Sequence, residues 1–147
     1  MHAFIPDFVP NAQRMVGIFQ AATAPTFFLG AVAAFASLMT LRMSAAMERV
    51  RVLNSISEDD PDRAYLKTDL DRLMRRAKLL KSGIFAALVA GVCATLLLAV
   101  LFTTEFFGFA YAYGAALLFL TATLFLGVAL VRFAQEVHIS LDEPDQY

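Results

Sequence analysis

Three long stretches without charge restrict what this chain can fold into. Residues 15–41, 82–104 and 106–131 contain no Asp, Glu, Lys, Arg or His. Each stretch exceeds the roughly 18 apolar residues that indicate a membrane-spanning helix. Hydrophobic residues make up 59% of the 147 residues, against roughly 45–50% in ordinary soluble domains. This pattern excludes a small soluble domain, a disordered chain and a disulfide-stapled secreted module. It predicts an all-α membrane protein with three transmembrane helices in one domain.

The apolar runs and their interruptions define the expected segments. Pro25 divides the first run, and a proline tends to begin or kink a helix. We therefore expect an interfacial segment over residues 1–24 and a first span over residues 25–41. The link at 103–108 is so short that the last two spans must form an antiparallel hairpin. The remaining segments are a cytoplasmic helical hairpin over 42–81, a second span over 82–102, a third span over 109–131 and a cytoplasmic tail over 132–147.

The distribution of basic residues predicts the orientation in the membrane. Ten of the 12 Lys and Arg residues lie between Arg42 and Lys81, and short loops rich in Lys and Arg stay in the cytoplasm. The N-terminus is then outside and the C-terminus inside, as in a multi-pass protein of the bacterial inner membrane. The net charge of −1 argues against nucleic acid as a partner.

Apolar residues recur at heptad spacing on both sides of the expected cytoplasmic turn. This spacing favours long first and second helices that project from the membrane as an antiparallel coiled-coil hairpin. A start signal for the second helix lies at Asp60, Pro61 and Asp62. The alternative is one amphipathic helix lying on the inner leaflet. The two heptad series are Met39, Met43, Ala46, Val50 and Leu53, then Leu66, Leu70, Leu73, Ala77, Leu80 and Ile84.

The charge-free runs offer nothing for buried acid–base or metal chemistry. Proton relays and haem sites inside membranes need ionisable side chains, which these runs lack. His2, His138 and Cys93 are too far apart in sequence to form a zinc site. We therefore expect no enzymatic activity and no cofactor.

One face of the first span carries small and weakly polar residues at helical spacing. Small residues allow close helix packing, with hydroxyl groups bonding across the contact. The alternative is a pore lined by the same face in a ring of subunits, with Glu48 or Arg51 at the inner mouth. A third reading is lipid-facing or accidental spacing. The candidate residues are Thr23, Thr26, Gly30, Ala33, Ser37, Thr40, Ser44, Glu48 and Arg51.

The second span and the segment before it carry two further candidate surfaces. Gly83, Ala87 and Gly91 form a small-xxx-small row, which predicts close packing against another helix. Basic residues directly before this span could meet anionic lipid headgroups. The excess of Lys and Arg that sets the orientation in the membrane accounts for most of them by itself. These residues are Arg72, Arg75, Arg76, Lys78 and Lys81.

The sequence also resembles a family of small bacterial membrane proteins described only as a domain of unknown function. The likeness covers roughly residues 16–135 and is carried by 24–30 (APTFFLG), 48–51 (ERVR) and 73–80 (LMRRAKLL). Leu41 replaces the Asn that usually precedes the family's Arg, and Glu48 replaces its usual Asp. The resemblance implies a three-span inner-membrane protein and brings no activity, substrate or cofactor.

Together these patterns favour a non-enzymatic membrane protein that acts as a self-associating or accessory subunit of a membrane complex. Its expected partners are the lipid bilayer and either further copies of itself or another membrane protein. The alternative function is an oligomeric ion channel or small transporter subunit, with the first span lining the pore.

Overall fold

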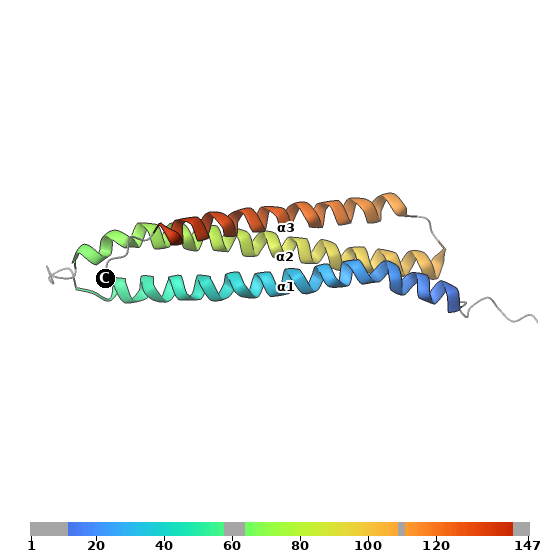
Figure 1. Cartoon of the computed structure of the whole chain (residues 1–147), viewed down its shortest axis with the longest axis horizontal. Helices are drawn as coiled ribbons and strands as arrows, with labels where there is room; N and C mark the ends of the chain where they lie inside the picture. Colours follow the sequence, from blue (N-terminus) through green and yellow to red (C-terminus); the bar gives the residue numbers. More distant parts are fainter. Residues whose placement is uncertain (1–11, 58–63, 109–110, 143–147) are drawn as a thin grey trace, which may run out of the picture.

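The computed structural model describes residues 12–57, 64–108 and 111–142. These residues form α1 (Ala12–Asn54), a 3₁₀ turn η1 (Ala64–Asp69), α2 (Leu70–Phe107) and α3 (Ala112–Leu141). Figure 1 shows the helices side by side in an elongated bundle, with α2 packed against both α1 and α3. All three α-helices are long and apolar enough to cross a membrane, as the charge-free runs predict.

Buried residues recur every seven positions on each helix. A seven-residue repeat keeps one side of a helix in contact with its neighbours along its whole length. Met39 and Leu80 are fully buried on this inward side. The repeats are Val32, Met39, Ala46 and Leu53 in α1, Leu73, Leu80, Ala87 and Ala94 in α2, and Ala122, Ala129 and Glu136 in α3.

Helix packing continues well beyond the charge-free runs. Val50 and Leu53 of α1 form a buried cluster with Leu73 of α2, and Ile56 and Leu70 pack against this cluster. The inward positions of the two predicted heptad series therefore meet in this part of the bundle. Which side of the membrane it occupies stays a prediction.

The connection between α1 and α2 is described only in part. The predicted helix start at Asp60, Pro61 and Asp62 lies outside the described residues. The described helical structure resumes with η1, and Asp69 precedes α2 without a side-chain capping hydrogen bond.

Pro25 lies inside α1, which continues through it as one helix. No helix boundary therefore lies at Pro25, and the N-terminal, blue part of α1 is inclined to the rest of the helix (Figure 1). Whether this part of α1 lies at the membrane interface stays a prediction. Pro25 is buried, and packing against a neighbouring helix can support a helix through the position where proline removes a backbone hydrogen bond.

The helices also extend past the expected ends of the spans. α2 continues to Phe107, and Gly108 ends it with φ 71°, a left-handed conformation that suits glycine. Its backbone N–H donates to the Thr104 carbonyl over 2.9 Å. α3 continues to Leu141, so Glu136 belongs to a packed helix rather than to an irregular tail.

Candidate functional site

A buried ion-pair cluster joins the three helices near one end of their apolar segments. Its centre is Glu136 of α3, whose exposed fraction is 0%. Arg76 of α2 donates from Nε and Nη2 to Glu136 Oε1 over 3.0 and 2.8 Å. Arg42 of α1 places Nε 3.1 Å from Glu136 Oε2, an ion-pair distance without hydrogen-bond geometry. One carboxylate is therefore shared between two guanidinium groups from different helices.

Aromatic side chains extend the contact between α1 and α3. Phe35 meets Phe133 edge to face, with ring centroids 5.2 Å apart, and Phe28 meets Phe119 at 6.2 Å. The Arg42 guanidinium lies 5.5 Å from the centre of the Phe133 ring, a cation–π distance. Long side chains thus bridge these two helices, which otherwise pack mainly against α2.

The cluster lies just beyond the charge-free runs. Arg42 directly follows the run 15–41, and Glu136 lies five residues past the end of the run 106–131. Five helical residues span roughly 7.5 Å, which corresponds to the headgroup region next to the hydrocarbon core. At that depth charged side chains are tolerated when they pair with one another.

Sequence reasoning missed Glu136 because it was assigned to the tail after the third span. A signal was present in the sequence: Ala122, Ala129 and Glu136 are spaced by seven residues. This is the spacing of the inward positions on the other two helices. A carboxylate in such a series needs a cationic partner, because an unpaired buried charge is costly.

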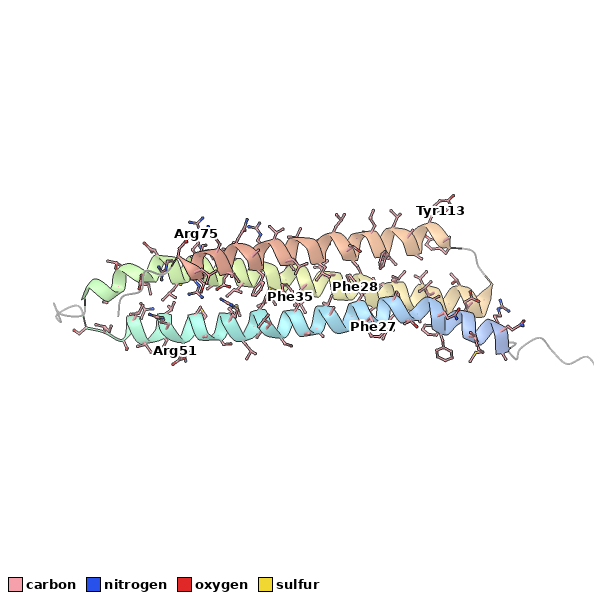
Figure 2. The ribbon with its side chains drawn as sticks, viewed as in Figure 1. Phe27, Phe28, Phe35, Arg51, Arg75 and Tyr113 are labelled. Atoms are coloured by element: carbon pink, nitrogen blue, oxygen red, sulfur yellow. The ribbon has the colours of Figure 1, made fainter. Side chains whose placement is uncertain are left out.

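The small-residue face predicted on the first span points away from the rest of the bundle. All nine candidate residues are exposed, and nothing lies within 4 Å of a Cβ built on Gly30. Figure 2 shows Phe27 and Arg51 on the outer side of α1, and Phe28 and Phe35 on the side of the other helices. Whether this face packs against another helix or lines a pore stays a prediction. The nine residues are Thr23, Thr26, Gly30, Ala33, Ser37, Thr40, Ser44, Glu48 and Arg51.

The hydroxyl groups on this outward face bond to their own helix. Thr23, Thr26, Ser37 and Thr40 each donate to the carbonyl oxygen four residues earlier, over 2.7 to 2.9 Å. Glu48 and Arg51 form an exposed ion pair of 3.2 Å. The hydroxyl oxygens remain available as acceptors.

The predicted small residues of the second span lie in the interior. A Cβ built on Gly83 would meet Met39 Sδ at 2.9 Å, and Ala87 is fully buried. A Cβ on Gly91 would lie 3.5 Å from Val32. The row therefore faces α1, with α3 also close to Gly83 through Ala129 and Arg132.

The five basic residues before the second span do not share one environment. Arg75, Lys78 and Lys81 are exposed, whereas Arg72 is half-buried. Arg76 belongs to the ion-pair cluster, and its side chain is 13% exposed. Contact of this segment with lipid headgroups stays a prediction.

A second charged pair lies at the opposite end of the bundle. Arg14 Nε is 3.5 Å from Glu105 Oε2, and both side chains are about half exposed. The pair borders a recess of about 400 Å³ whose wall also includes Thr104 and Tyr111. Tyr113, close to this recess in sequence, is 90% exposed. Within residues 12–57, 64–108 and 111–142, no three His, Cys, Asp or Glu side chains are grouped as metal ligands.

Three apolar helices tied together by charged groups at their ends define a multi-pass membrane protein. Over residues 22–144 the chain matches the family DUF2721, described as a protein of unknown function, and it belongs to that family. The match includes all three residues of the ion-pair cluster. No curated protein and no solved structure matches the chain.

Proposed function

We propose that this chain is a non-enzymatic subunit of a membrane complex, which it forms with further copies of itself or with another membrane protein. The observation that supports the proposal is the outward face of α1, which follows the helix from Thr23 to Arg51 without serving the chain's own packing. In lipid, close backbone approach at small residues is a main source of helix association. A face of this kind is suited to a second helix.

The proposed setting is the bacterial inner membrane, with the N-terminus outside. The basic residues between Arg42 and Lys81 support this orientation through the positive-inside rule. The packed ends of α1 and α2 near Val50, Leu53 and Leu73 then form a cytoplasmic helical hairpin. This hairpin offers a second surface for contacts within the complex.

An ion channel or small transporter subunit is the alternative function, favoured by the hydroxyl groups on the same face. A ring of subunits could direct Ser37 and Thr40 towards water, with Glu48 and Arg51 at the mouth. Their hydroxyl groups donate to α1 itself, which also suits a dry contact between helices. We therefore rank packing above conduction.

Cysteine cross-linking in reconstituted vesicles distinguishes these functions. In a Cys93→Ser background, we compare Ser37→Cys on α1 with Thr123→Cys on α3. Both positions are exposed and carry a hydroxyl bonded to the carbonyl four residues earlier. Self-association predicts spontaneous disulfide dimers for Ser37→Cys and few for Thr123→Cys.

The outcomes against the proposal are equally definite. Equal dimer yields at both positions would contradict α1 as the self-association face. A monomeric native mass without a co-purifying protein would contradict the complex itself. Rapid labelling of Ser37→Cys by a water-soluble thiol reagent, together with ion flux, would favour the channel instead.

A further inference from the structure

Arg42 contacts Glu136 and the Phe133 ring at the same time. Its Nε faces Glu136 at 3.1 Å, and its guanidinium lies over the Phe133 ring at 5.5 Å. Phe133 in turn packs against Phe35, with the two ring centroids 5.2 Å apart. The long Arg42 side chain therefore loses little further freedom if it contacts a ligand.

The rest of the guanidinium is available for an anion. In the part of the chain that the structure describes, the two Nη groups of Arg42 make no hydrogen bond. The Arg42 side chain is 33% exposed, compared with 13% for Arg76 and 0% for Glu136. Two parallel N–H donors in a planar group match two oxygens of a phosphate.

The charge of the cluster favours an anionic ligand. Glu136 neutralises only one of the two arginines that contact it, which leaves a formal charge of +1 on the three side chains. Arg132 adds an exposed cation four residues, about one helical turn, before Glu136 on α3.

The place of Arg42 at the end of an apolar run favours a lipid headgroup as the source of that anion. Arg42 is the first charged residue after the run 15–41, so it meets the membrane where lipid phosphates lie. We propose that Arg42 binds the phosphate of an anionic phospholipid headgroup at this end of the bundle. Glu136 and Phe133 act as positioning residues that hold its guanidinium in place. Free inorganic phosphate has the same chemistry and is the alternative source that the test must separate.

Native mass spectrometry of the full-length protein in mild detergent can measure this binding. Phosphatidylglycerol is titrated against phosphatidylcholine, whose choline offsets the phosphate charge. We expect the wild type to prefer phosphatidylglycerol and Arg42→Gln to bind it about tenfold more weakly, as for the loss of a charge-assisted bidentate contact. The matched control is Arg75→Gln, an exposed arginine on α2 with the same charge change, for which we expect little effect.

The positioning role gives a result that simple charge attraction would not. Glu136→Gln makes the protein more positive, so attraction alone predicts tighter phosphatidylglycerol binding, whereas loss of positioning predicts weaker binding. Phe133→Leu leaves the charge unchanged and should also weaken binding, which keeps the test valid if Glu136→Gln fails to fold. Tighter binding by folded Glu136→Gln, or unchanged binding by Phe133→Leu, would overturn the positioning role.

Two further outcomes would overturn the site itself. The first is equal losses for Arg42→Gln and Arg75→Gln, which would indicate general attraction to a basic surface. The second is displacement of phosphatidylglycerol by inorganic phosphate at the same concentration, which would make free phosphate the ligand. Retained lipid binding under that competition supports the headgroup.

Discussion

The outward faces of α1 and α3 are both exposed but are built from different side chains. Along α1 the face consists mainly of Gly, Ala, Ser and Thr, as at Gly30 and Ser37. On α3 it is dominated by large apolar residues, such as Leu117 and Leu124, both 64% exposed. α3 also carries an exposed threonine, Thr123, bonded to its own helix. The two faces therefore differ clearly in the size of their side chains, although both carry exposed hydroxyl groups.

Size decides what each face can contact in a membrane. Lipid tails are as apolar as leucine, so the large side chains of α3 need no protein partner. Small side chains on α1 leave a shallow surface where a second helix backbone can approach closely. Under the proposed function, α3 would face lipid and α1 would face a further helix. The following changes test this difference.

The largest effect is expected from Glu136 of α3, which pairs with Arg42 of α1 and Arg76 of α2. Glu136→Ala leaves Arg42 and Arg76 without their shared carboxylate, and breaking a buried ion pair costs about 3–5 kcal/mol. We expect a large loss of unfolding free energy in detergent. The control is Glu48→Ala, which removes an exposed pair with Arg51 and should cost about 0.5 kcal/mol. Equal losses would show that the cluster does not hold the bundle.

An intermediate effect is expected from Gly83 of α2, which lies directly against the Met39 side chain of α1. Gly83→Val places new atoms against Met39 Sδ, which would lie only 2.9 Å from the added Cβ. Overpacking of this kind costs about 1–3 kcal/mol. Gly127→Val on α3 is the control, because nothing lies within 4 Å of its Cβ. Thermal unfolding of both variants tests the difference, and an unchanged Gly83→Val would contradict the close contact.

A smaller effect, on association rather than on folding, is expected from Gly30. Gly30→Leu makes the outward face of α1 resemble that of α3, and nothing inside the bundle opposes the added side chain. We expect unchanged monomer stability and dimerisation about tenfold weaker, measured by energy transfer between labelled copies in vesicles. The same change at Gly127 should leave dimerisation unaltered. A similar loss at both glycines would remove the distinction between the faces.

The charge pattern was sufficient to predict three membrane-spanning helices, because it depends only on local composition. The face of α1 that packs inside the chain is harder to predict. Met39 and Ser37 both belong to regular helical series, and only the position of α2 shows which series is inward. The sequence predicts a boundary at Pro25, whereas α1 continues through it. The difference arises because whether a proline ends a helix depends on packing that the sequence does not display.

The ion-pair cluster could not be predicted from local sequence patterns either. Arg42, Arg76 and Glu136 lie on three different helices and are far apart in the chain. The sequence places Arg76 in one basic run with Arg75, whereas Arg75 is exposed on α2 and Arg76 is largely buried. A search for polar residues in the seven-residue series of α3 would have found Glu136.

The smallest expected effect concerns the hydroxyl groups of α1, which separate dry packing from a wet pore. Thr40→Val keeps the shape of the side chain and removes a hydroxyl that donates to the Ala36 carbonyl over 2.8 Å. Because that donor is already used within α1, we expect dimerisation to change by about 0.6 kcal/mol or less in the same energy-transfer assay. A loss as large as that of Gly30→Leu would mean that the hydroxyl bonds across the contact. Unchanged dimerisation combined with altered ion flux would instead place Thr40 in water, and the outward face of α1 would then be a pore lining.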